Sequence, residues 1–318
     1  RNMKGYVKAV CISKERGTVK QNVKKAVLKE QYGLEGDAHA GKWHRQVSLL
    51  SQDKVEEFNQ KGGMAGPGDF GENILLEGID LAALPVGTIL ECGTARLKIT
   101  QIGKECHHHC EIYQRVGDCI MPREGIFAEV LSGGEITVGD QIRVTSQPED
   151  DPLTAAVITL SDKGFAGERK DTSGPRAAKI LREYGYEVVE EVLLPDEQKK
   201  IEKELIRLSD SRQVSLILTT GGTGFSMRDR TPEATLAVAD RQAPGIAEAI
   251  RAGSMEITKR AMLSRGVSVI RGRTLIINLP GSEKAVAESL SFIMDSLEHG
   301  IRILRGTASE CGAACKEK

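Results

Sequence analysis

Residues 214–224 read Val-Ser-Leu-Ile-Leu-Thr-Thr-Gly-Gly-Thr-Gly, and this stretch decides the fold class of the second half of the chain. An apolar run that ends directly in a glycine-rich turn is typical of a strand buried on both faces of a parallel sheet. Thr231-Pro232-Glu233 then predicts a helix start, with Thr231 as N-cap and Pro232 at the first helical position. The stretch therefore predicts a strand, a turn and a helix of an α/β domain.

The same alternation of strand and helix extends to both sides of this stretch. The predicted strands are residues 155–160, 187–194, 214–220 and 274–279, and the predicted helices include 174–184 and 197–208. Such alternation predicts right-handed crossovers and a largely parallel sheet covered by helices.

The first half of the chain has a different pattern. Short β-branched or alternating segments separated by glycine-containing turns predict strands at residues 7–12, 47–50, 73–76, 88–92, 97–102, 127–131 and 141–144. One helix is predicted over 52–59, with Ser51 as its cap. We expect a mostly-β domain closed into a barrel or compact sandwich, because closure removes exposed sheet edges.

Length and composition agree with two domains. The 318 residues exceed a usual single domain, and we expect domains at 4–145 and 153–310, a linker at 146–152 with two prolines and three acids, and a tail at 311–318. A formal net charge of −1 argues against nucleic-acid binding. With neither a membrane-spanning run nor a signal peptide, and with seven cysteines, the sequence predicts a cytoplasmic protein with reduced thiols.

Polar or turn residues follow each of the four predicted parallel strands. They are Ser161-Asp162, residues 194–197, residues 219–224 and residues 279–282. Ligands bind beyond the carboxyl ends of such strands, so we expect one shared crevice. Gly221, Gly222 and Gly224 offer bare N–H groups to an anion, although an ordinary tight turn also explains them. The spacing matches neither a P-loop nor a dinucleotide fingerprint.

Two aspartates are candidate metal ligands near this turn. Asp229 lies between Arg228 and Arg230, and a carboxylate there suits Mg²⁺ bridging nucleotide phosphates; a solvated Arg–Asp pair is the alternative. Asp196 ends the second strand, and it is either the N-cap of the following helix or a metal or substrate ligand.

In this order, the motifs of the second half resemble the Mog/MoaB-type molybdopterin adenylyltransferases over nearly all of residues 153–310. The matching segments are 158–162, 171–175, 194–197, 219–233, 261–265 and 275–282. The resemblance implies transfer of AMP from Mg-ATP to molybdopterin, with Asp196 and Asp229 as essential carboxylates, and a trimer. It also implies a nucleotide and pterin site formed by Ser161, Asp162, Ser173, Gly174, Thr220, Gly221, Gly222, Thr223, Gly224, Ser264, Pro280, Gly281 and Ser282.

Residues 103–110 of the first half read Gly-Lys-Glu-Cys-His-His-His-Cys. Zinc is not favoured here, because adjacent residues cannot all point at one ion. A reactive thiol at Cys106 or Cys110 is the alternative, since Lys104 and the histidines favour thiolate; a solvated surface loop is equally compatible.

The residues around this loop resemble the MOSC domain of molybdenum-cofactor sulfurases. The matching segments are 33–41, 44–50, 68–74 and 106–125, within residues 4–145. The resemblance implies a domain that binds the pterin cofactor, with a cysteine, foremost Cys106, that carries sulfur or binds metal. The other candidate cofactor contacts are His39, Arg45, Asn73, Cys110, Cys119 and Arg123.

Two functions are compatible with these features. One is a bifunctional enzyme that adenylylates molybdopterin and binds, sulfurates or hands on the cofactor, with a cysteine desulfurase and the molybdate-inserting enzyme as partners. The other is a non-catalytic carrier that binds the pterin in both halves. Pyrophosphate release from Mg-ATP distinguishes them.

Overall fold

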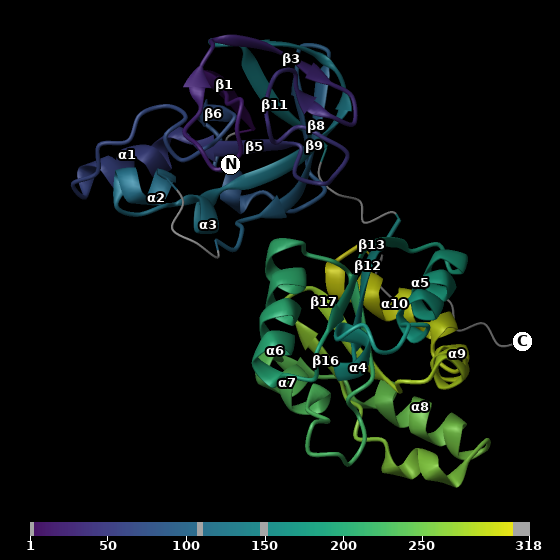
Figure 1. Cartoon of the computed structure of the whole chain (residues 1–318). Coiled ribbons are helices and arrows are strands. Elements are labelled where there is room, and N and C mark those ends of the chain that lie inside the picture. Colours follow the sequence, from purple (N-terminus) through teal and green to yellow (C-terminus); the bar gives the residue numbers. More distant parts are fainter. Residues whose placement is uncertain (1–2, 107–110, 147–151, 308–318) are drawn as a thin grey trace, which may run out of the picture. The chain divides into compact units, whose positions relative to one another are not determined.

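The chain forms two compact units, residues 1–148 and 149–318 (Figure 1). The computed structural model describes residues 3–106, 111–146 and 152–307. Most of the predicted linker and all of the predicted tail lie outside these residues. No helix in the described ranges is long and apolar enough to cross a membrane.

Seven strands close the N-terminal unit into a barrel, in the order β11-β7-β8-β9-β5-β6-β1 with a further β1–β11 pairing. They are β1 (Lys4–Ile12), β5 (Val47–Ser51), β6 (Ile74–Glu77), β7 (Ile89–Cys92), β8 (Ala95–Ile102), β9 (Ile126–Ser132) and β11 (Gln141–Ser146). Each contains one of the seven strands predicted from the sequence, to within a few residues. The predicted mostly-β domain is confirmed. Of the two predicted forms, a barrel and a compact sandwich, the barrel is correct.

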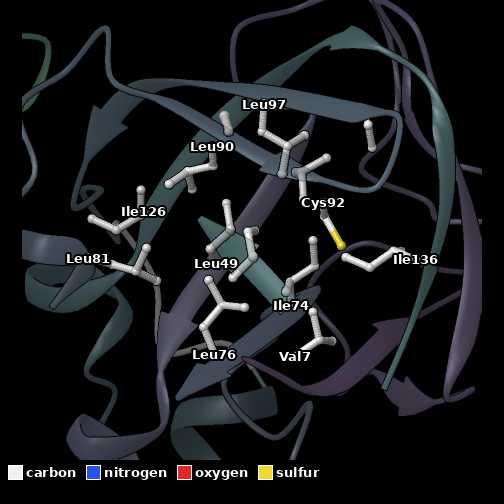
Figure 2. Packing of buried hydrophobic residues seen from close by; sticks show 14 of the residues in the cluster. Val7, Leu49, Ile74, Leu76, Leu81, Leu90, Cys92, Leu97, Ile126 and Ile136 are labelled. Carbon is white, nitrogen blue, oxygen red and sulfur yellow. The ribbon is translucent and has the colours of Figure 1, made fainter. Parts of the chain in front are cut away.

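Alternation along the strands fills the barrel. β1 contributes Val7 and Val10 to the barrel core, whereas Ala9 and Cys11 are buried in a second cluster with Val55 and Phe70, and the lysines of β1 are exposed. Figure 2 shows Val7, Leu49 and Ile74 packed with other apolar side chains in the barrel interior. Burial of these side chains supplies most of the stabilisation of the unit.

Smaller elements surround the barrel. β2 (Gln21–Asn22) extends the sheet, and a second sheet contains β3 (Lys25–Lys29), β4 (Gly33–Leu34) and β10 (Gly134–Thr137). The helices are α1 (Gln52–Gln60), α2 (Glu111–Val116) and α3 (Met121–Glu124). Ser51 precedes α1 as predicted, but its hydroxyl donates to Ile79 O rather than capping the helix.

A six-stranded sheet organises the C-terminal unit, in the order β13-β12-β14-β17-β16-β15. The first four strands, β13 (Glu187–Leu194), β12 (Thr154–Leu160), β14 (Leu216–Thr220) and β17 (Thr274–Leu279), are parallel and were all predicted. β16 (Ser268–Arg271) and β15 (Arg241–Gln242) were not predicted, and they are antiparallel.

Helices cover both faces of this sheet (Figure 1). One face packs against α5 (Ser173–Glu183), α8 (Pro244–Met255), α9 (Glu283–Ser291) and α10 (Met294–Arg305). The other packs against α6 (Gln198–Ile206) and α7 (Thr231–Val238). The short α4 (Asp162–Phe165) follows β12 directly. The predicted α/β fold is confirmed, and the carboxyl ends of its parallel strands share one edge.

Candidate functional site

The four parallel strands end side by side. Their register pairs Leu160 with Leu194, Thr159 with Thr220, and Thr220 with Leu279. The segments that follow the strands therefore leave the sheet at one edge, which is where ligands bind in open α/β sheets.

The glycine-rich turn after β14 is shaped for an anion. Gly221 and Gly222 have φ of 93° and 69°, which few residues other than glycine adopt. A Cβ at Gly281 would lie 3.3 Å from Gly221 Cα, so two turns touch here. The amide N–H groups of Gly222, Thr223 and Gly224 donate to no other residue that the structure describes. Such free amides in a left-handed turn form an anion-binding concavity.

Thr231 secures this turn in a way that the sequence did not predict. Helix α7 begins at Thr231 itself, and the capping position is Arg230, which makes no side-chain cap. The predicted N-cap role of Thr231 is therefore wrong by one residue. Its hydroxyl instead donates to Gly221 O at 3.0 Å, and its amide donates to Gly222 O.

Asp196 faces the turn and does not cap a helix. Helix α6 begins at Gln198 with Glu197 before it, so the capping alternative for Asp196 is wrong. Asp196 Oδ2 accepts from Asp162 N at 3.1 Å, and Asp162 Oδ1 accepts from Asp196 N at 3.0 Å. Burial, reinforced by the charges of Asp162 and Asp229, raises the pKa of Asp196.

Asp229 lies on the other side of the turn. Its Oδ2 accepts from Ser226 N at 3.0 Å and would lie 2.8 Å from a Cβ at Gly224. In both Asp196 and Asp229, one carboxylate oxygen is held by a backbone amide, and the other accepts no hydrogen bond from a described residue.

This pair of carboxylates fits Mg²⁺ better than a metal held entirely by protein. Within residues 3–106, 111–146 and 152–307, no three His, Cys, Asp or Glu side chains converge to hold a metal ion. Mg²⁺ needs only one or two carboxylates when substrate phosphates and water complete its shell. Two oriented carboxylates beside free amides meet that requirement.

Two arginines fix the charged loop; the sequence did not predict the partner of Arg228 and did not single out Arg265. Arg228 donates to both oxygens of Asp162, at 2.9 and 2.7 Å, and this hydrogen bonding lowers the pKa of Asp162. Arg265 donates to Gly224 O at 2.7 Å and Asp229 O at 2.6 Å, and it pairs with Glu233. The guanidinium of Arg265 thus clamps both ends of the segment that carries Asp229.

A cavity of about 420 Å³ adjoins the ends of β12 and β17. Four predicted residues line it, namely Ser161, Ser173, Gly281 and Ser282, and so do Arg169 and Lys170, which the sequence did not single out. Arg169 and Lys170 can each contact a phosphate group, and the carboxylates of Asp171 and Glu283 line the same cavity.

Asp171 organises the wall of this cavity. Its carboxylate accepts from Thr159 Oγ1 at 2.8 Å and from Gly174 N at 3.1 Å. Ser173 Oγ also bonds Thr220 Oγ1 at 2.9 Å. A Cβ at Gly174 would press on Asp171 Oδ2, which explains why glycine stands there.

The remaining predicted residues of this half serve the turns. Ser161 Oγ accepts from Gly164 N, and Ser282 Oγ accepts from Ala285 N. Ser264 Oγ accepts from Gly266 N, just before Arg265, and Pro280 follows β17. A second cavity of about 350 Å³, lined by Phe225, Met227, Asp229 and Arg265, lies over the same loop.

The N-terminal unit has a cavity of its own, of about 330 Å³. Three of the predicted cofactor contacts line it, namely His39, Arg45 and Asn73. Arg16, Trp43 and Lys104 also line it, and the sequence did not single out Arg16 or Trp43. The guanidinium carbons of Arg45 and Arg16 lie 4.5 and 5.5 Å from the Trp43 ring centroid, so a cationic and aromatic wall forms.

Asn73 has a structural role at this cavity. Its Oδ1 accepts from Ser48 N at 2.9 Å, and its Nδ2 donates to Cys11 O at 3.0 Å. The side-chain amide therefore links β5 to β1, and both its oxygen and its nitrogen are hydrogen-bonded.

The predicted thiols are separated. Cys106 is exposed, next to the lining residue Glu105, whereas Cys119 is buried among Met121 and Phe127. Arg123 is exposed and lies 3.6 Å from Asp118. Cys110 lies outside the described residues. Cys11 and Cys92 are buried, as predicted, and burial raises the pKa of their thiols to about 12 and about 11.

Comparison with known proteins assigns each half to a described family. Residues 156–299 match the family "Probable molybdopterin binding domain", and residues 36–143 match the MOSC domain.

Relatives that match the C-terminal half include two curated proteins and one solved structure. The molybdopterin adenylyltransferase of Escherichia coli is 42% identical over 47% of this chain and 80% of its own length. The Drosophila melanogaster molybdenum cofactor synthesis protein cinnamon is 41% identical over 48% of this chain, but the match spans only 26% of the fly protein. The solved Thermus molybdopterin biosynthesis enzyme MoaB is 45% identical, covering 48% of this chain and 97% of its own, with a TM-score of 0.47.

Proposed function

We propose that this chain, which belongs to the molybdopterin adenylyltransferase family through its C-terminal domain and carries a MOSC domain before it, transfers AMP from Mg-ATP to molybdopterin. It acts in molybdenum cofactor biosynthesis. The observation that carries the proposal is the pair of half-engaged carboxylates, Asp196 and Asp229, on either side of a turn with free amides.

In this proposal the turn holds phosphate oxygens. The amides of Gly222, Thr223 and Gly224 donate to them without any side-chain movement, because the turn is already formed. Such preorganised donors stabilise negative charge as it develops on the leaving pyrophosphate.

Asp196 and Asp229 would hold Mg²⁺ through their free oxygens. Bound Mg²⁺ neutralises phosphate charge and orients the leaving group. The amide bonds from Asp162 and Ser226 keep each carboxylate in place, and Arg228 holds Asp162 so that its charge is balanced.

The cavity beside β12 and β17 is our proposed pterin site. Ser161, Ser173 and Ser282 offer hydroxyls, while Arg169 and Lys170 offer positive charge for the terminal phosphate. An oxygen of that phosphate would attack the α-phosphorus of ATP. A new P–O bond to AMP would form while the bond between AMP and the leaving pyrophosphate breaks. Alignment of the two supplies much of the rate enhancement.

The test is a reaction of the full chain with molybdopterin and Mg-ATP. We expect pyrophosphate and an AMP–pterin product from the wild type, and a loss of at least about 100-fold in Asp229→Asn. Asp295→Asn is the matched control, because Asp295 is exposed in the first turn of α10, outside the proposed site. A fully active Asp229→Asn protein would contradict the metal assignment, and absence of pyrophosphate from the wild type would favour the carrier function.

We also propose that the N-terminal domain binds the cofactor in its cavity and that Cys106 carries sulfur. Exposure of Cys106 beside the cavity supports this, whereas the buried Cys119 lacks access. Mass spectrometry after incubation with a cysteine desulfurase and cysteine checks it. We expect one added sulfur atom on Cys106 and none on Cys119, and an unmodified Cys106 would exclude the role.

A further inference from the structure

A buried ion pair lies beneath the N-terminal cavity. Lys20 Nζ is 2.6 Å from Asp37 Oδ1, and both side chains are almost fully excluded from solvent. Burying two charges is costly even when they are paired. The pair is therefore better explained by what it organises than by its contribution to stability.

Lys20 uses all three of its ammonium protons. Its partners are Asp37 Oδ1, Ser13 Oγ at 3.1 Å and His39 Nδ1 at 3.1 Å. Ser13 donates its own hydroxyl proton to Glu15 O, so it accepts from Lys20. Burial lowers the pKa of Lys20, and the hydrogen bond and charge of Asp37 oppose this effect. The 2.6 Å contact with the Asp37 carboxylate supports the ammonium form, which has no lone pair. His39 Nδ1 must therefore be the acceptor.

This contact decides where His39 carries its proton. A neutral imidazole has one donor and one acceptor nitrogen, so an accepting Nδ1 leaves the proton on Nε2. Nε2 makes no hydrogen bond to a described residue, and His39 lines the cavity.

The position of the ring is equally constrained. Asp37 Oδ2 accepts from His39 N at 3.2 Å, and Trp43 Nε1 donates to His39 O at 2.9 Å. The same aspartate that charges Lys20 thus also fixes the backbone of His39.

Charges around the ring oppose a second proton. Burial lowers the pKa of His39 most, and the positive charge of Lys20 lowers it further. Lys104 and Arg16 act in the same direction and Asp37 in the opposite one, and the pKa falls to about 4. His39 accordingly stays neutral at physiological pH, although its ordinary pKa is near 6.5.

We propose that His39 donates a hydrogen bond from Nε2 to an oxyanion in the N-terminal cavity, with Lys20 and Asp37 as its positioning residues. The ligand class is a phosphate group, because the lining carries Arg16, Arg45 and Lys104 against the single carboxylate of Glu105. A neutral donor binds the anion with a strength that does not change with histidine titration. The identification of the phosphate as that of the pterin rests on the proposed function of this domain.

The first test needs no ligand. Full-length protein labelled at the histidine rings is titrated from pH 5 to 8 by NMR, with His39 assigned from the signal lost in His39→Gln. We expect no titration of His39 in this range and nitrogen shifts that place the proton on Nε2. A His39 that titrates near pH 6.5, or a proton on Nδ1, overturns the proposal.

The double variant Lys20→Met/Asp37→Asn removes both buried charges together, which avoids leaving one unpaired. We expect the His39 proton to lose its fixed place on Nε2, because Nδ1 no longer accepts a hydrogen bond from Lys20. His44 serves as the internal control, because its Nε2 contacts Gln101 Oε1 rather than Lys20, and its signal should be unchanged. Nitrogen shifts of His39 that are the same in the folded double variant as in the wild type would contradict the role of Lys20.

Binding is tested with inorganic phosphate at pH 7.5, followed by fluorescence of Trp43, the only tryptophan, which lies in this cavity. We expect His39→Leu to weaken phosphate binding about 10-fold or more, and His39→Gln, which keeps a donor, to weaken it less. Equal affinities in wild type and His39→Leu would overturn the proposal. None of these measurements depends on adenylylation. Failure of this proposal can therefore be told apart from failure of the adenylyltransferase activity proposed for the C-terminal domain.

Discussion

Replacement of Gly222 by alanine tests the shape of the anion-binding turn most directly. The left-handed backbone at Gly222 costs a residue with a Cβ about 1–2 kcal/mol. The added Cβ would also overlap Thr231 Oγ1 and lie 3.2 Å from Asp196 Oδ1. Forcing extra volume into a packed site costs a further 1–3 kcal/mol or so.

Gly185→Ala separates these two effects. Gly185 has φ of 84°, but nothing lies within 4 Å of a Cβ placed there. This variant should therefore show the backbone cost alone, about 1 kcal/mol or slightly more.

Thermal unfolding followed by calorimetry measures the difference. For a domain of this size we expect Tm to fall by about 3 °C in Gly185→Ala and by on the order of 10 °C in Gly222→Ala. Adenylyl transfer should also drop in Gly222→Ala, because Asp196 is displaced, and remain unchanged in Gly185→Ala. Equal losses of Tm in the two variants would refute the packing described for the turn.

Three further predictions concern other groups. Arg265→Met should lower adenylylation at least about 10-fold because the Asp229 loop loses its clamp, whereas the exposed Arg260→Met should not; equal rates would contradict the clamp. Burial raises the pKa of Glu72 from 4.5 to about 7, so folding favours its protonated form, and the stability it contributes below pH 4.5 is lost as pH rises through 7. Urea unfolding followed by Trp43 fluorescence should accordingly show Glu72→Gln gaining about 3 kcal/mol over wild type between pH 5 and 8, and a gap independent of pH would refute the titration. Thr159→Val should cost about 1–2 kcal/mol in calorimetry through loss of the bond to Asp171, and an unchanged Tm would show that the bond contributes nothing.

Elements with strong periodicity were predictable from the sequence. Two sequence patterns, the apolar run ending at Thr220 and the alternation in β1, indicate which side chains are buried. The type of each strand and its approximate limits could therefore be predicted. β15 and β16 were missed because two- and four-residue strands are too short to show a period.

The candidate sites were predictable where the signal was local. The glycines and Asp229 lie in one short stretch of sequence, so their proximity could be predicted without knowledge of the fold. Arg265 and Lys20 were not identifiable, since their partners lie many residues away and a lysine ordinarily predicts an exposed position. The N-cap role predicted for Thr231 and the capping alternative for Asp196 were wrong, because contacts from other turns engage these side chains.

The pairing of β1 with β11 bears on how the N-terminal domain is made. Lys4 pairs with Arg143, so one edge of β1 stays open until the last barrel strand has been synthesised, well after β6 has covered the other edge. At about 5–20 residues per second, the ribosome needs several seconds for the intervening chain. An uncovered strand edge recruits other chains, and charged side chains oppose this. We therefore expect Lys4 and Lys8, which are exposed along β1, to oppose aggregation of the nascent chain before the barrel closes.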